Sequence, residues 1–91
     1  MKPATSQESW RPPLTAAARA LRLGLEGEGS EQLTRFIDRL LPDLGSQAPQ
    51  QLAALNEVLT AMLQGQARKD FLLVADLLEY EVAPFLEQHL S

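Results

Sequence analysis

Apolar residues recur at helical spacing along most of this chain, and charged residues lie mainly between them. The segments 14–25, 33–44 and 52–63 each place leucine, alanine, phenylalanine or methionine three or four residues apart. This spacing is typical of helices that bury one face. The strict alternation of a half-buried strand is absent from the sequence. The pattern therefore predicts an all-α fold, a small bundle of three to four antiparallel helices.

The first residues are expected to form an arm outside this bundle. Residues 1–13 are rich in proline and serine, and the pair Pro12-Pro13 marks where a helix can begin. We therefore expect a flexible N-terminal arm at 1–13, a single helical domain at 14–91, and a first helix from Leu14 to Leu23. Trp10 is the only tryptophan, and we interpret it as an anchor that pins the arm to the domain; a contact with a partner is the alternative.

The glycine-rich stretch 24–29 is expected to end the first helix and to serve as a hinge. It lacks the Gly-Lys-Ser/Thr ending of a phosphate-binding loop, and its two glutamates would repel phosphate. Ser30 suits the N-cap of the second helix, whose apolar stripe follows directly. Pro42 is expected to end or kink that helix.

The third helix is expected to begin near Pro49, and its C-terminal end has two interpretations. Arg68 and Lys69 suit the end of a helix and Asp70 suits the next N-cap, which predicts a break. The apolar phase nevertheless continues across the join, which would favour one helix from 50 to 83. We favour the break.

The last quarter of the chain is its most apolar part. Seven of the eight residues in Phe71–Leu78 are apolar, so a helix over about Asp70–Ala83, kinked at Pro84, would be apolar nearly all round. We expect this helix at the centre of the bundle or at a dimer interface, with more apolar surface than one short chain can cover. The candidate interaction residues are Phe71, Leu72, Val74, Asp76, Leu77, Leu78, Tyr80 and Glu81.

Composition narrows the possible partners. The chain carries a net charge of −4, and residues 41–91 contain two basic against seven acidic side chains, which disfavours nucleic acid. No apolar run approaches the length of a membrane span. The chain has no cysteine, so disulfides and thiolate metal sites are excluded. We expect a cytoplasmic protein.

Candidate chemistry is sparse. His89 is the only histidine and lies near the terminus, so no Ser-His-acid set can be assembled around it. Asp76, Glu79 and Glu81 form the densest polar group. Their carboxylates suggest a metal or small-ligand site as an alternative, although no Glu-x-x-His motif accompanies them. We expect no enzyme activity and no cofactor.

Asp76 interrupts the apolar run, and a carboxylate there requires a donor. We expect a hydrogen bond or ion pair from an arginine of another helix; a recognition point for an incoming partner helix is the alternative. The candidate donors are Arg19, Arg22, Arg35 and Arg39.

The segment Lys69–Leu86 reads Lys-Asp-Phe-Leu-Leu-Val-Ala-Asp-Leu-Leu-Glu-Tyr-Glu-Val-Ala-Pro-Phe-Leu. It resembles the C-terminal signature of a family of small all-helical bacterial domains of unknown function: Lys-Asp, an apolar run, Ala-Asp-Leu-Leu-Glu-Tyr-Glu, two residues and Pro. The resemblance covers about eighteen residues, and over 14–66 only the leucine spacing agrees. It implies an all-helical domain and brings no activity with it.

These observations predict a non-enzymatic protein-interaction module, a helical homodimer that acts as an adaptor or chaperone and masks an apolar helix of another protein. A helical bundle with a carboxylate metal or small-ligand site is the alternative.

Overall fold

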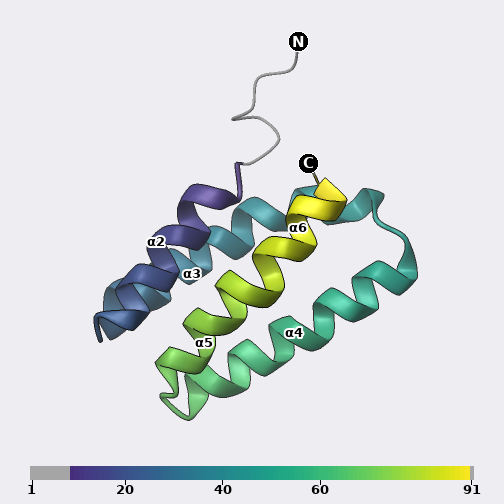
Figure 1. Cartoon of the computed structure of the whole chain (residues 1–91). Helices are drawn as coiled ribbons and strands as arrows, with labels where there is room; N and C mark the ends of the chain where they lie inside the picture. The colour runs from purple at the N-terminus through teal and green to yellow at the C-terminus, as the bar shows by residue number, and fades with distance from the viewer. Residues whose placement is uncertain (1–8, 91) are drawn as a thin grey trace.

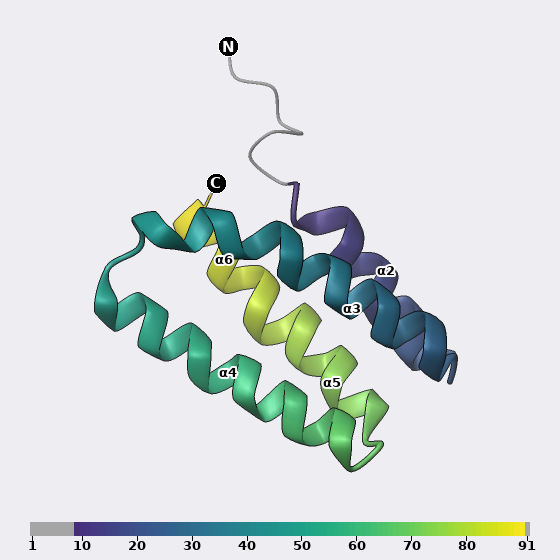
Figure 2. The same ribbon diagram turned by 180° about the vertical axis from the view of Figure 1, so that it is seen from behind.

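The chain folds into an all-α bundle in which the C-terminal helix lies between the other helices. The computed structural model describes residues 9–90, and this range contains no strand. In chain order its elements are α2 (Arg11–Arg22), α3 (Glu26–Leu40), the 3₁₀-helix η1 (Leu41–Ser46), α4 (Pro49–Ala67), α5 (Phe71–Leu77), the π-helix η2 (Leu78–Val82) and α6 (Ala83–Leu90). Figures 1 and 2 show α2 and α3 as an antiparallel pair on one side and α4 on the other, with α5–α6 between them.

The domain begins earlier than the sequence predicted. Trp10 is completely buried, as expected of an anchor, and α2 starts at Arg11 rather than Leu14. Pro12 and Pro13 lie in the first turn of the helix. Backbone N–H groups in a first turn have no acceptor within the helix, so proline, which lacks this group, is tolerated there. Residues 9–13 are therefore part of the domain. The expectation for residues 1–8 lies outside the described residues.

The turn between α2 and α3 is a Schellman motif that ends at Gly24. The backbone nitrogen of Gly24 donates to the Leu21 carbonyl at 3.1 Å, and that of Leu25 donates to the Ala20 carbonyl at 2.9 Å. Gly24 has a φ of 77°, a conformation that glycine adopts without strain. Of the glycines in the stretch 24–29, this one ends a helix.

The expected hinge over 24–29 and the Ser30 N-cap are wrong. Helix α3 already starts at Glu26, so two of these glycines and Ser30 lie inside it. Gly29 is buried, and its lack of a side chain allows α3 to approach α2 closely. The Ser30 hydroxyl instead accepts a hydrogen bond from Nε2 of Gln66 at 2.7 Å, which links α3 to the end of α4.

Prolines set the limits of the middle elements. Helix α3 ends at Leu40, and Pro42 lies in the 3₁₀-helix that follows, in agreement with the predicted end of this helix. Pro49 is the first residue of α4, as predicted. The Gln51 side chain accepts a hydrogen bond from the Ala48 backbone nitrogen at 3.3 Å and so fixes the start of α4.

The predicted break between α4 and α5 is confirmed, and it is a second Schellman motif. Lys69 donates to the Gln66 carbonyl at 3.0 Å and Asp70 to the Gly65 carbonyl at 2.8 Å. Lys69 occupies the left-handed position here, with a φ of 61°. The Asp70 carboxylate then accepts from the Leu73 backbone nitrogen at 3.4 Å as the N-cap of α5.

The kink expected at Pro84 takes the form of a π-helical turn. A proline in an α-helix removes one hydrogen bond and clashes with the carbonyl four residues earlier. The five-residue π-helix η2 ends directly before α6, and Ala83 donates to the Leu78 carbonyl, five residues back. This wider turn lets the helix continue through Pro84 to Leu90 instead of ending at Ala83.

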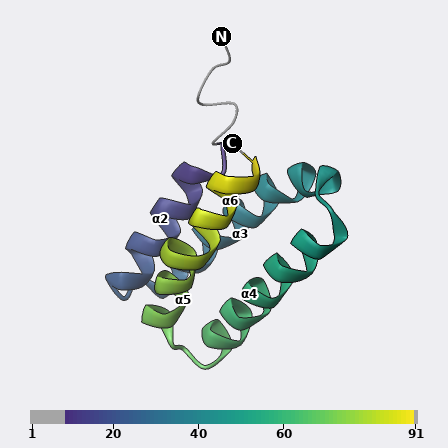
Figure 3. The same ribbon diagram turned by 45° about the vertical axis from the view of Figure 1, so that its right-hand side comes forward.

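The core lies along the C-terminal helix. Helix α5 and η2 contact both α2 and α4, and Figure 3 shows α4 set apart from the α2–α3 pair. The predicted central position of the last helix is confirmed. The largest completely buried side chains are those of Trp10, Phe36, Leu40, Met62, Val74, Leu78, Val82 and Leu86.

Candidate protein-interaction surface

The predicted interaction residues fall into two groups. Val74 and Leu78 are completely buried, and Phe71 and Leu77 are partly buried and pack against the core. One chain therefore covers most of this apolar run, contrary to the expectation, and Leu72 is the residue that stays exposed. As the middle helix, α5 has neighbours on both sides, and α2 and α4 cover most of its apolar surface.

The remaining predicted residues stay at the surface. Leu72 is 60% exposed and Tyr80 is 69% exposed, and Asp76 and Glu81 are also exposed. Tyr80 and Glu81 belong to the π-helical turn η2. Exposed apolar side chains that occur singly are normal on soluble proteins, so Leu72 by itself does not identify an interface.

Asp76 has its expected partner, an arginine of another helix. Arg22, at the end of α2, donates from Nη2 to Asp76 at 2.9 Å and from Nε to Glu79 at 2.8 Å. These hydrogen bonds raise the pKa of Arg22 above its ordinary value, and the bond to Glu79 has a larger effect than the bond to Asp76. One guanidinium therefore bridges two carboxylates and ties α2 to the central helix.

An apolar groove lies between η1 and α4. The groove there, which we call the α4 groove, has a volume of about 520 Å³. Its lining residues are Leu41, Leu44, Pro49, Leu52, Ala53, Leu55, Asn56 and Leu59. Asn56 is the one polar residue in this lining, and Leu41 is 57% exposed. The α4 groove therefore leaves apolar surface uncovered within this chain.

Charge is scarce around the α4 groove. Residues 41–67 contain Asp43 and Glu57, which are two of the twenty charged side chains in the whole chain. Helix α4 itself carries only Glu57 in its nineteen residues. Depletion of charge is the compositional mark of the centre of a protein interface, whereas a solvated helix face normally carries Lys and Glu.

Two signals in the sequence could have identified this surface. The first signal is that helix α4 has alanine and valine outside the buried stripe that contains Leu55 and Met62. The second is that the helix carries a single charged residue. A helix that is apolar on several faces needs more than one neighbour. The Phe71–Leu78 segment, with a higher apolar density, was the more conspicuous candidate, and the α4 stripe has the spacing of an ordinary core helix.

A metal site and a membrane span are two further possibilities for residues 9–90. No group of three or more His, Asp or Glu side chains within residues 9–90 is placed to hold a metal ion. Over the same range, no helix has both the length and the apolar character needed to cross a membrane.

Comparison with known proteins identifies the family of this chain. Neither the curated proteins nor the solved structures include a significant match to this chain. A family model, described as a domain of unknown function (DUF8042), matches residues 25–90. This range runs from the turn before α3 to the end of α6 and so includes the whole α4 groove. Because the match covers most of the chain, the chain belongs to the DUF8042 family of domains of unknown function.

Proposed function

We propose that this chain is a non-enzymatic protein-interaction module that forms a homodimer through the α4 groove. The observation that carries this proposal is the uncovered apolar lining of the groove, with Leu41 more than half exposed. Leaving such surface in water costs free energy in proportion to its area. Association with a second protein surface removes that cost.

A second copy of the chain is the occupant that the charge distribution favours. The chain has a net charge of −4, so two copies that meet through most surfaces would repel each other. The α4 surface is nearly uncharged, and two copies can approach there without like-charge repulsion. Symmetric dimers with the same patch on both subunits are the commonest oligomers.

The expected stability of the dimer follows from its leucines. Each copy contributes Leu41, Leu44, Leu52 and Leu59 from the groove lining. Complete burial of an exposed leucine contributes about 1.5–3 kcal/mol, and these are already partly covered. Association costs at least about 4 kcal/mol. We therefore expect a reversible dimer in the micromolar range, as suits a module that exchanges partners.

The adaptor or chaperone role expected from the sequence is part of the same proposal. When such a dimer dissociates, its groove becomes accessible, and an apolar helix of another protein can bind there in place of the second copy. A cytoplasmic location accords with the absence of cysteine.

The alternative, a carboxylate metal or small-ligand site, has less support. Its best carboxylates are Asp76 and Glu79, and Arg22 already donates hydrogen bonds to both. A cation would have to displace this guanidinium.

Sedimentation equilibrium with matched variants tests the proposed function. Leu41→Glu places a charge in the groove at a side chain that is 57% exposed, and Leu72→Glu makes the same change on α5 at one that is 60% exposed. We expect wild type and Leu72→Glu to approach twice the chain mass of 10.0 kDa as concentration rises, and Leu41→Glu to stay monomeric with unchanged circular dichroism. A wild-type monomer at all concentrations, or equal weakening by both substitutions, would contradict the proposal.

A further inference from the structure

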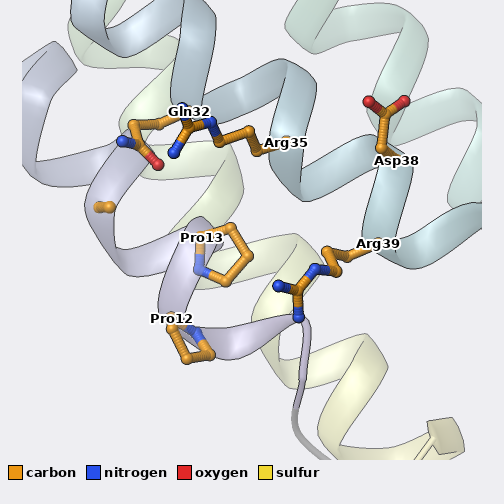
Figure 4. A pocket seen from close by; sticks show the side chains of 7 residues that line it. Pro12, Pro13, Gln32, Arg35, Asp38 and Arg39 are labelled. Carbon is orange, nitrogen blue, oxygen red and sulfur yellow. The ribbon is translucent and has the colours of Figure 1, made fainter.

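A second groove, of about 720 Å³, lies on the other side of the molecule between the first turns of α2 and the second half of α3. Figure 4 shows Pro12 and Pro13 facing the side chains of α3 across it. The α3 side carries Gln32, Arg35 and Arg39. The groove therefore combines a rigid apolar wall with cationic and amide donors.

The two guanidinium groups lie on one side of α3. Arg35 and Arg39 are four residues apart, so they are neighbours on the helix surface, and their Cα atoms lie about 6 Å apart along the axis. In Figure 4 both side chains extend from α3 toward α2. Two planar donor groups on one side of a helix suit two carboxylates, because guanidinium geometry matches the carboxylate.

Both arginines are available to a ligand. The Arg39 side chain has no hydrogen bond or ion pair with any residue of the described range 9–90. Arg35 pairs with Glu31 at 2.9 Å, but the two side chains are 63% and 64% exposed. Exposed pairs of this kind contribute little to stability and exchange readily.

Asp38 also lines the groove and would oppose an anion. Its carboxylate points away from the two prolines and from the Arg39 guanidinium in Figure 4. The centre of the groove, next to Pro13, is therefore faced by the arginines and not by the carboxylate.

The geometry points to a binding site for an acidic peptide, in which Arg35 and Arg39 pair with two carboxylates and the proline pair contacts the apolar residue between them. In an extended peptide, side chains two residues apart lie on the same face, about 6.6–6.8 Å apart. Acidic residues at alternate positions would thus come close to the axial distance of about 6 Å between positions 35 and 39. This inference concerns a different surface from the α4 groove and does not depend on the dimer.

A peptide fits better than nucleic acid. Affinity for nucleic acid comes from many phosphate contacts, and this groove offers two guanidinium groups beside an aspartate on a chain of net charge −4. Two carboxylates saturate the site, whereas a phosphate backbone would extend beyond it.

Fluorescence anisotropy with a labelled Gly-Glu-Leu-Glu-Leu-Gly peptide tests the inference. We expect saturable binding that weakens as sodium chloride is added. The double variant Arg35→Gln/Arg39→Gln should lose at least about tenfold in affinity, because two charge-assisted hydrogen-bond sites are removed. Arg68→Gln/Lys69→Gln is the matched control: it removes the same charge from exposed side chains in the α4–α5 turn and should retain wild-type affinity.

Three results would overturn the inference. One is the absence of saturable binding at millimolar peptide. Another is equal loss in the two double variants, which would indicate attraction to overall charge. The third is tighter binding of an oligothymidylate of similar length, which would assign the groove to nucleic acid. Leu41→Glu should bind the peptide normally, so failure of the dimer and failure of this site are distinguishable.

Discussion

Gly29 lies directly against the side chain of Leu21. A Cβ atom at position 29 would be 2.6 Å from Cδ2 and 3.0 Å from Cγ of that leucine, which is itself almost completely buried. Interiors are packed too tightly for such an overlap to be absorbed freely. The absence of a side chain at Gly29 therefore sets the distance between α2 and α3.

Because α2 and α3 approach each other closely at Gly29, we expect alanine substitutions at Gly29 and Gly27 to change the stability in opposite directions. Gly29→Ala should destabilise the protein by about 1–3 kcal/mol through overpacking. Gly27→Ala, two residues earlier, meets no atom within 4 Å, and should stabilise by up to about 1 kcal/mol because alanine favours the helix. Urea denaturation measures both changes. Similar effects of the two substitutions would contradict the packing described.

The two Schellman turns predict a stabilising substitution. Gly24 and Lys69 occupy the same left-handed position, with φ values of 77° and 61°. Lysine is strained there and glycine is not, so Lys69→Gly should raise the free energy of unfolding by about 0.5–1 kcal/mol. Arg68→Gly, at a φ of −86°, has no such strain to relieve and should be neutral or destabilising.

The buried position of the central helix predicts a contrast between two leucines. Leu78 is completely buried and Leu72 is 60% exposed. Leu78→Ala should cost about 2–5 kcal/mol through loss of contacts and a residual cavity, whereas Leu72→Ala should stay within about 0.5 kcal/mol of wild type. Thermal and urea unfolding would show this contrast. A large effect at Leu72 would indicate that a partner covers that face.

The Arg22 bridge predicts a small, salt-sensitive effect with a defined pH dependence. Arg22→Gln should lower the urea midpoint more than Arg19→Gln, which changes an exposed arginine of the same helix without an ion pair among residues 9–90. Because hydrogen bonding raises the pKa of Arg22 in the folded state, its contribution is fully present below the ordinary arginine pKa. It is lost only as the pH rises through the higher folded value. The difference between the two variants should therefore persist from neutral to mildly alkaline pH and shrink with added salt.

Salt should separate the two proposed interactions. The α4 groove is nearly uncharged, so sodium chloride should leave the dimer unchanged and sulfate should strengthen it. Peptide binding at Arg35 and Arg39 should weaken as either salt is added. Sedimentation and anisotropy measured in the same buffers would reveal this opposite response. A dimer that dissociates with sodium chloride would indicate a charged interface elsewhere.

Local sequence signals predicted much of the fold. The prolines at 42 and 49 and the N-cap Asp70 act on the local backbone, so their effects follow from neighbouring residues. The expected burial of Trp10 is also observed, and it follows from the size and apolar character of this one side chain. The arginine partner of Asp76 was also expected in kind, because a carboxylate in an apolar stretch requires a donor.

Features that depend on packing between helices were missed. The sequence of Gly27 and Gly29 favours a break, and contact with Leu21 instead places Gly29 within α3. The apolar density of Phe71–Leu78 predicted a central helix correctly. The low charge of α4 marked it in the sequence as a second candidate. Which helix keeps uncovered surface is decided by how many neighbours each one has after the helices pack.

The central claim, association through the α4 groove, is tested most directly by NMR of amide signals during dilution from millimolar to low micromolar protein. We expect concentration-dependent shifts at residues 41–59, which include η1 and the first half of α4, and constant signals in α2. Shifts confined to the exposed positions of α5 and η2 would contradict the claim, as would spectra that do not change with concentration.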